Sequence, residues 1–247
     1  MVTPAGRSLI DAPGTDEATW RAWPELARLG VADIASWTSA VVLAAHPDDE
    51  VLGVGGLISL LAAAGARLTL IAVTDGEASH PGIADPMALA ERRIAETTAA
   101  LRVLGAAGTQ VVRLRLPDTG LAGREDEITF LLRRLVAGFD VCLAPWEMDA
   151  HADHEAVGRA ARRASPQAIF YPVWTWHWAH PGDPRVPWRD AMRVPLPPAV
   201  AARKRAAIDC FASQLEPRAA GIGPMLSPAT VAHFTRDHEV LFPVKHT

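Results

Sequence analysis

Apolar residues along the chain fall into short continuous runs that alternate with longer segments in which they repeat at helical spacing. A short continuous run is the pattern of a strand buried on both faces of a parallel sheet. A longer segment with one polar side is the pattern of a surface helix. The runs predict strands at residues 40–45, 68–73, 111–116, 141–144, 169–173 and 240–242, and the segments predict helices at 51–64, 86–104, 125–137, 153–164 and 198–213.

Regular alternation of strands and helices is typical of βαβ units with right-handed crossovers. We therefore predict an α/β fold, with an open, mostly parallel, Rossmann-like sheet that carries helices on both faces. The strand at 169–173 is expected at the sheet edge. Residues 39–247 are expected to form a single domain, and residues 1–38 an N-terminal leader packed on it.

Composition and charge narrow the class of protein. The chain has 247 residues, of which 49% are hydrophobic and 21% charged, and its formal net charge is -4. This mild acidity gives no attraction to nucleic acid. No apolar run is long enough to span a membrane, and the first residues lack the apolar core of a signal peptide. Cys142 and Cys210 lie far apart and are expected to be reduced thiols. The sequence predicts a cytoplasmic protein and leaves the oligomeric state open, a homo-oligomer included.

The most informative segment is Ala-His-Pro-Asp-Asp-Glu at residues 45–50, directly after the first strand. Ligands of open α/β sheets bind beyond the carboxyl ends of the strands. Three consecutive acids at such a place repel one another unless positive charge is nearby. The N-terminus of the following helix contributes a few tenths to ~1 kcal/mol, which is too little for three carboxylates. A bound divalent metal ion accounts for them better than a helix-capping role does.

A second segment, Asp-Ala-His-Ala-Asp-His at residues 149–154, follows the fourth predicted strand. His151 and His154 are three residues apart, so they share one face if a helix begins here. The two strands can bring His46, Asp49 and His154 to the same edge of the sheet. Two imidazoles and a carboxylate make a catalytic zinc site with a position left open for water. We therefore predict one zinc ion per chain, although each histidine taken alone would be an ordinary polar residue.

Four of the chain's eight tryptophans lie within residues 171–188. Tryptophan offers a large amphipathic surface on which a sugar ring can stack, so Trp176 is expected to contact the substrate. The alternative is that this loop folds back and its tryptophans form a satellite core. His80 follows the second predicted strand and is expected to line the cleft.

The two histidine-containing motifs resemble those of the PIG-L / LmbE-like deacetylase family, whose members carry (P/A)HPDDE and a later HxDH. The resemblance runs from about residue 39 to residue 214. It implies a metal-dependent amide hydrolase, usually with zinc, that removes the N-acetyl group from an N-acetylglucosamine conjugate. A small N-acetylated sugar conjugate is then the expected partner. Weaker matches are Thr74-Asp75-Gly76-Glu77, Arg93 with Glu96, Ala100 and Leu104-Gly105, Leu116-Pro117-Asp118 with Leu121, and Lys204 with Ser213-Gln214.

The resemblance also implies roles for single residues. By position, His46, Asp49 and His154 hold the metal. Asp48 is the general base, and His151 is an electrostatic or acid partner that stabilises the oxyanion in its protonated form.

Further matches concern the substrate. Arg93 and Asp118 correspond to positions that contact the sugar. One position departs from the family pattern: some members carry a tyrosine two residues before the first histidine of HxDH, where this chain has Asp149. A tyrosine oxyanion donor is therefore not expected at that position.

Two other functions fit parts of the pattern. A metal-dependent phosphoesterase usually needs a second metal bridged by carboxylates, and Asp48, Asp75 and Asp149 are available. A non-catalytic nucleotide- or sugar-binding module is suggested by the sheet and by the glycines within residues 53–56, but no G-x-G-x-x-G motif follows the first strand. Those glycines fall inside the first helix, where they are expected to permit close packing.

Overall fold

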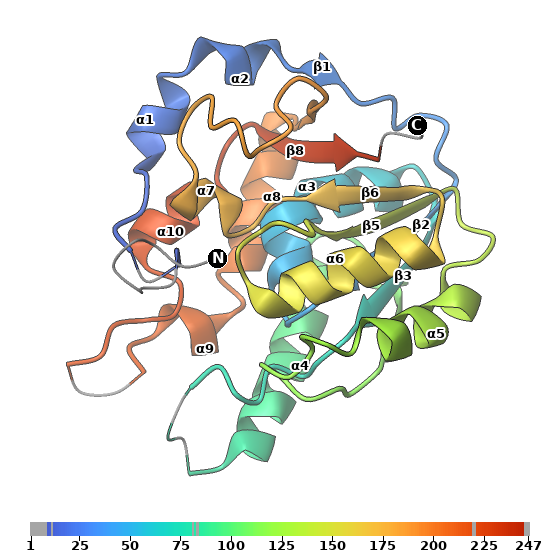
Figure 1. Cartoon of the computed structure of the whole chain (residues 1–247), viewed down its shortest axis with the longest axis vertical. Coiled ribbons are helices and arrows are strands. Elements are labelled where there is room, and N and C mark those ends of the chain that lie inside the picture. The colour runs from blue at the N-terminus through green and yellow to red at the C-terminus, as the bar shows by residue number, and fades with distance from the viewer. Residues whose placement is uncertain (1–8, 11, 81, 83, 219–220, 245–247) are drawn as a thin grey trace.

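The structure, a computed structural model, describes residues 9–10, 12–80, 82, 84–218 and 221–244 (Figure 1). Its strands are β1 (Gly30–Val31), β2 (Ser39–Ala44), β3 (Arg67–Ala72), β4 (Gln110–Arg113), β5 (Val141–Pro145), β6 (Ala168–Tyr171), β7 (Met192–Pro195) and β8 (His238–Pro243). Its helices are α1 (Glu17–Arg21), α2 (Pro24–Arg28), α3 (Asp49–Ala63), α4 (Pro86–Val103), α5 (Glu125–Leu135), α6 (Ala152–Ala164), α7 (Thr175–Trp178), α8 (Pro198–Ile208), α9 (Ala212–Leu215) and α10 (Pro228–Ala232).

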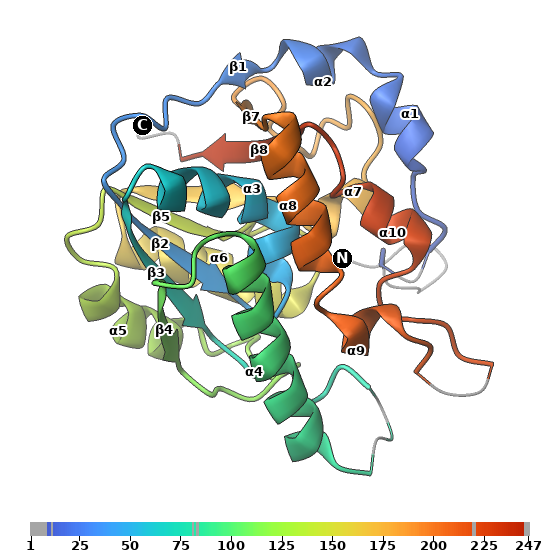
Figure 2. The same cartoon turned by 180° about the vertical axis from the view of Figure 1, so that it is seen from behind.

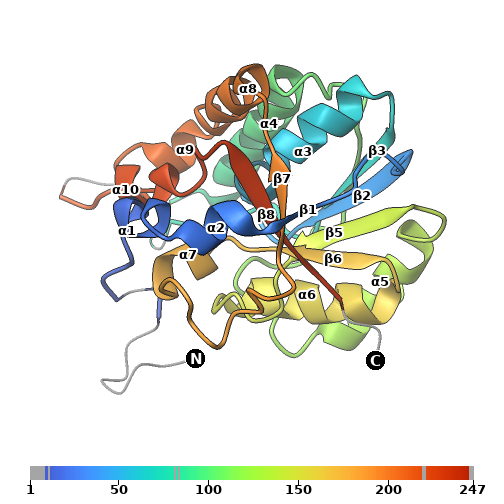
Figure 3. The same ribbon diagram turned by 90° about the horizontal axis from the view of Figure 1, so that it is seen from above.

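The strands form one sheet in the order β1-β7-β8-β6-β5-β2-β3-β4. Neighbouring strands are parallel except at β8, which runs antiparallel to β6 and β7. Helices α3, α4 and α8 cover one face of the sheet (Figure 2), and α5 and α6 cover the other (Figure 3). The predicted α/β class with an open, mostly parallel sheet is confirmed.

The centre of the sheet is apolar, since every residue of β2 and β5 is buried. Such strands read as continuous apolar runs because helices cover both faces. No helix among the described residues is both long and apolar enough to cross a lipid bilayer.

Two predicted elements are corrected. The strand expected at the sheet edge is β6, which lies inside the sheet because β8 returns along its outer side and pairs Phe242 with Phe170. The outermost strands are β1 and β4. The helix predicted at 198–213 is interrupted between Ile208 and Ala212, where the chain turns and buries Phe211 in the hydrophobic core.

The N-terminal segment is tied to the rest of the chain at α1 and β1. Trp20 is fully buried, and its indole nitrogen donates a hydrogen bond to the carbonyl oxygen of Trp176 at 2.8 Å. Strand β1 joins the sheet in parallel beside β7. The division predicted after residue 38 stays a prediction, and residues 1–8 and 11 of that leader lie outside the described residues.

Helix α3 has an internal break at Val54 (φ -138°, ψ 23°). The backbone N–H groups of Gly56 and Leu57, just beyond the break, donate to the two carboxylate oxygens of Glu239 at 2.6 and 2.8 Å. Lys204 Nζ lies 2.7 Å from the same carboxylate, and both side chains are buried. A buried ion pair of β8 and α8 therefore caps the second part of α3.

Glycines let the neighbours of α3 approach closely. A Cβ at Gly53 would collide with the ring of Tyr171, and a Cβ at Gly56 would collide with Leu196. The prediction that these glycines permit close packing is confirmed. The close contacts and the Glu239 cap together fix α3, whose first turn begins at the carboxyl end of β2.

The Glu239→Gln variant should be destabilised, because it leaves the buried Lys204 ammonium without its counter-charge. Breaking a buried ion pair typically costs about 3–5 kcal/mol, which denaturant titration measures as a lower free energy of unfolding. The double variant Glu239→Gln/Lys204→Met removes both charges and should recover most of the loss. A single variant within about 0.5 kcal/mol of the unchanged chain, as for an ordinary surface substitution, would contradict the capping role.

Candidate active site

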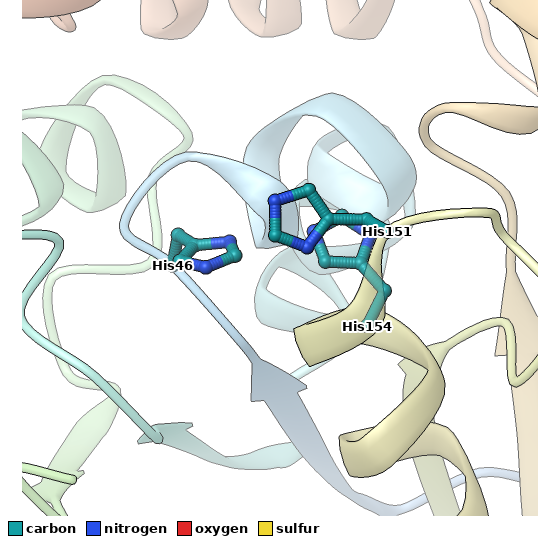
Figure 4. Close-up of side chains that lie close together, drawn as sticks. All are labelled: His46, His151 and His154. Carbon is teal, nitrogen blue, oxygen red and sulfur yellow. The ribbon is translucent and has the colours of Figure 1, made fainter. Parts of the chain in front are cut away.

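The two histidine motifs meet at the carboxyl end of the central strands. His46 follows β2, and His151 and His154 lie at the start of α6, just after β5, the hydrogen-bonded neighbour of β2. Figure 4 shows the three imidazoles gathered at this edge. Ring centroids are 4.6 Å apart for His151 and His154, 4.8 Å for His46 and His151, and 5.3 Å for His46 and His154.

Asp49 stands between two of these imidazoles. Its Oδ1 is 3.2 Å from His154 Nε2, and its Oδ2 is 3.5 Å from His46 Nδ1. The backbone N–H of His46 donates to Oδ2 at 2.8 Å, which holds the carboxylate in this position. All three residues are buried. The structure thus brings together the three residues that the sequence analysis predicted as metal ligands.

Other carboxylates hold the opposite ring nitrogens. Asp149 lies 2.8 Å from His154 Nδ1, and Asp118 and Asp153 each lie 3.2 Å from His46 Nε2. A carboxylate on the outer nitrogen sets the tautomer and the orientation of a metal-binding imidazole. The inner nitrogens, which are His154 Nε2 and His46 Nδ1, therefore face the carboxylate of Asp49 between the two rings.

The surroundings of His154 Nε2 indicate that this atom binds a group other than a protein side chain. The atom is buried, and apart from the ion-pair contact with Asp49 at 3.2 Å it makes no hydrogen bond in the described part of the chain. A buried polar atom without a hydrogen bond costs free energy. Two imidazole nitrogens and a carboxylate oxygen are the donor set of a catalytic zinc site, so the residues present fit a divalent metal ion.

Two other groups of ligand atoms occur among the described residues. The first consists of His46, His151 and His154, and the second of His46, Asp118 and Asp153. Both groups include His46, so they overlap and do not form two independent sites. This overlap does not favour the bridged pair of metals that a phosphoesterase usually needs.

The charges in the cluster favour a bound cation. Burial opposes protonation of His154, yet Asp49 and Asp149 raise its pKa to about 9. Burial likewise opposes protonation of His46, but its carboxylate neighbours, Asp118 first, raise its pKa well above the usual value. Protons on the two imidazoles balance the carboxylates here, and metal binding releases such protons.

His151 differs from the other two histidines. Burial and then the charge of the neighbouring imidazoles lower its pKa to about 3. Its Nδ1 accepts the backbone N–H of Asp153 at 3.3 Å, so the ring proton of the neutral tautomer is on Nε2. While the imidazoles beside it carry positive charge, the ring is therefore a neutral hydrogen-bond donor. The protonated His151 expected from the sequence stays a prediction.

Asp48 has a strained backbone at the start of α3. Its φ of 116° is a conformation that costs about 1–3 kcal/mol for a residue with a side chain. Arg93 holds this turn, since Nη2 donates to the carbonyl oxygen of Pro47 at 2.5 Å and lies 3.3 Å from Asp48 Oδ2, and Nη1 donates to the carbonyl oxygen of Gly76 at 3.0 Å. Burial raises the pKa of Asp48 to about 7, although Arg93 opposes the shift.

A cavity of about 240 Å³ opens at the cluster. Predicted substrate contacts Arg93 and Asp118 both line it. Asp118 also accepts the backbone N–H of Ala78 at 2.9 Å, and Arg93 Nε is buried without a partner among the described residues. The lining includes His46, Asp48, Asp49 and His151 together with Ser79, Trp174, Gln214, Met225 and Leu226.

Trp176, a predicted substrate contact, lies elsewhere. It is 4% exposed, and its ring centroid is 5.1 Å from that of Trp20. It belongs to the satellite core considered as the alternative for this loop. The tryptophan that lines the cavity is Trp174. Residues two apart on a helical turn point to nearly opposite sides, so only one of the two can face the cavity.

His80, the other predicted lining residue, is also placed differently. Its Nδ1 lies 2.8 Å from Ser79 Oγ. Ser79 lines the cavity, whereas His80 is not among the lining residues. The lining residue predicted from the sequence was therefore one position too late in the chain: it is Ser79.

Asp149 has a role that sequence analysis missed. Its buried carboxylate accepts the backbone N–H groups of Val173, Trp174 and Thr175 at 3.1, 2.9 and 2.8 Å, in addition to facing His154. It therefore links the imidazole in the cluster to the segment that carries Trp174. The signal in the sequence was an acid where some family members have tyrosine.

Comparisons with known proteins agree with this geometry. A family model described as PIG-L: GlcNAc-PI de-N-acetylase matches residues 41–165. The chain is 34% identical over 151 residues to a 1D-myo-inositol 2-acetamido-2-deoxy-alpha-D-glucopyranoside deacetylase of Kineococcus radiotolerans, a match covering 58% of this chain and 40% of that protein. It is 29% identical over 157 residues to a second such deacetylase, of Catenulispora acidiphila, covering 53% of this chain and 52% of that protein.

The chain thus spans about half or less of the length of these curated relatives. Among solved structures, a conserved protein from Thermus thermophilus superposes with a TM-score of 0.58 at 26% identity, covering 84% of this chain and 96% of that chain. The range matched by the family model begins in β2 and ends just after α6, so it contains both histidine motifs. On this match, the chain belongs to the PIG-L family of de-N-acetylases.

Proposed function

We propose that this protein is a zinc-dependent amide hydrolase that removes an N-acetyl group from an N-acetylglucosamine-type sugar conjugate. The observation that carries the proposal is the buried His154 Nε2, which makes no hydrogen bond among the described residues and faces the carboxylate of Asp49 beside His46. Family membership supports the reaction class, and the named substrates of the two curated relatives are N-acetylated glucosamine conjugates.

The proposed ligands are His46, Asp49 and His154, and they would hold one zinc ion per chain. Zinc bound in such a site polarises an acyl oxygen and lowers the pKa of water from ~15.7 to ~7. The carboxylates on the outer ring nitrogens support this assignment, because they leave the inner nitrogens free to bind.

Asp48 and His151 are the proposed catalytic residues. Asp48 lines the cavity next to the ligand Asp49 and is placed to accept a proton from the attacking water. His151 lines the same cavity and would donate a hydrogen bond from Nε2 to the acyl oxygen. Water adds to the acyl carbon, the C–N bond breaks, the amine leaves with a proton, and acetate is released.

Arg93 and Asp118 are proposed to bind sugar hydroxyls. Both line the cavity, and Arg93 Nε is an unpaired donor among the described residues. Arg93 also supports the turn of Asp48, so its substitution would affect catalysis as well as substrate binding. A sugar ring offers several hydroxyls that a guanidinium and a carboxylate can bind together.

The His154→Ala and His46→Ala variants should each bind less than one zinc ion per chain, because each loses an inner nitrogen. Metal analysis after dialysis measures the occupancy. The matched control is His151→Ala, which removes a neighbouring imidazole. The Nδ1 atom of that imidazole already accepts a hydrogen bond, so the control variant should keep its zinc. Full occupancy in a His46→Ala/His154→Ala double variant would refute the ligand assignment.

The Asp149→Asn variant should bind zinc about 10–100-fold more weakly, as is typical when the partner of a metal-binding histidine is lost. Competition with a chelator of known affinity measures the dissociation constant. The control is Asp140→Asn, which removes an exposed carboxylate bonded to Thr38 and Ser39 at the opposite end of β5. Equal zinc affinity in both variants would mean that Asp149 does not position His154.

The Asp48→Asn variant should keep its zinc and lose turnover by about 10²–10⁴-fold, the usual contribution of a general base. Acetate release from N-acetylglucosamine and its glycosides, by zinc-loaded protein, measures the rate. The adjacent Asp49→Asn variant should lose the metal instead. If the two variants show the opposite behaviour, the roles of the two carboxylates are exchanged.

A further inference from the structure

The cavity has an apolar wall, formed by Trp174, Met225 and Leu226, that the proposed chemistry does not use. Trp174 immediately precedes α7, and Met225 and Leu226 lie between α9 and α10. Figures 1 and 2 show these three short helices along one side of the molecule. Segments distant in sequence thus meet to form one side of the cavity.

The two halves of this wall are held by polar contacts. Asp149 accepts the backbone N–H of Trp174 at 2.9 Å. On the other side, the backbone N–H of Leu226 donates to the carbonyl oxygen of Gln214 at 2.9 Å, and Glu96 of α4 binds the backbone N–H of Ser213 at 2.8 Å. The wall is therefore set in place before a ligand binds, which lowers the entropy cost of binding.

The wall lies outside the range that the family model matches. That range ends at residue 165, whereas the three wall residues begin at 174. Trp174 and Met225 are only partly buried. Aromatic and aliphatic side chains that line a cavity are typical of the part of a ligand site that binds an apolar group.

The opposite side of the cavity is polar and would take the sugar. Arg93, Asp118 and Ser79 line it beside the residues of the metal cluster. If the acetamide group of the substrate lies at Asp48 and His151, these polar side chains can donate and accept hydrogen bonds to the hydroxyls of the sugar. The substituent on the anomeric carbon is the part of the substrate left for the apolar wall.

We infer that the apolar wall is an aglycone subsite, and that the substrates are N-acetylglucosamine conjugates with an apolar aromatic or alkyl aglycone. This inference rests on the proposed function. A polyol aglycone would lose hydration against Trp174, Met225 and Leu226, and only Gln214 and Arg218 of the neighbouring lining could offer it hydrogen bonds. An aromatic or alkyl aglycone would instead bury apolar surface against Trp174. The preferred substrate therefore differs from the inositol conjugate named for the relatives.

Acetate release from a series of N-acetylglucosaminides of one anomeric configuration, with methyl, phenyl, hexyl and inositol aglycones, tests the inference. For the zinc-loaded protein, kcat/KM should be about tenfold higher for phenyl or hexyl than for methyl, with inositol no better than methyl. Trp174→Ala should bring the phenyl-to-methyl ratio close to one, and Trp174→Phe should keep most of it. The surface variant Phe130→Ala, on an exposed side chain of α5, should keep both the ratio and the rates.

Two results would overturn the inference. One is a phenyl-to-methyl ratio near one in the unchanged chain. The other is an equal loss for both glycosides in Trp174→Ala, which would mean that the indole stacks on the sugar itself.

A binding experiment distinguishes failure of the subsite from failure of the proposed deacetylase function. Calorimetric titration of zinc-loaded Asp48→Asn with the same glycosides measures the preference without turnover. Tighter binding of the phenyl glycoside, by about tenfold, supports the subsite even if the unchanged chain releases no acetate from any glycoside. Equal or absent binding of the phenyl and methyl glycosides overturns the subsite whatever the rates are.

Discussion

The placement of Asp49 between His46 and His154 is the constraint on which the site depends. One carboxylate faces the inner nitrogens of two buried imidazoles, and further carboxylates occupy their outer nitrogens. Removing this much negative charge from water is costly unless positive charge accompanies it. Protons can supply that charge, but His154 Nε2 then has only the ion-pair contact with Asp49 at 3.2 Å and no hydrogen bond among the described residues. A divalent ion would balance the charge and also bond to this nitrogen.

The rest of the fold serves to hold this arrangement. Strands β2 and β5 are parallel neighbours, so the segments that follow them meet at one edge. Glu239 and Lys204 cap the second part of α3 beyond its break, and the first turn of α3 carries Asp49. Asp149 binds both His154 and the backbone of Trp174. Asp149 consequently connects the histidine–carboxylate cluster to the apolar wall.

Sequence analysis predicted the features that follow from local pattern and from the geometry of parallel strands. Continuous apolar runs identified β2 and β5, and their shared edge brought the two histidine motifs together. The position of β6 was not predictable, since it depends on the antiparallel return of β8 from the far end of the chain. Trp174 and Trp176 could not be told apart, because the direction of a short helical turn is set by tertiary contacts such as that of Trp176 with Trp20. The role of Asp149 depends on backbone N–H groups more than twenty residues away.

The central claim is that one ion binds the inner nitrogens of His46 and His154 together with Asp49. Anomalous diffraction at the zinc absorption edge, from crystals of the zinc-loaded protein, locates the ion directly. We predict a single strong peak bonded to His154 Nε2, His46 Nδ1 and an oxygen of Asp49, at the usual ~2.0–2.2 Å. A peak on His46 Nε2 with Asp118 and Asp153, or no peak at this edge of the sheet, would contradict the account.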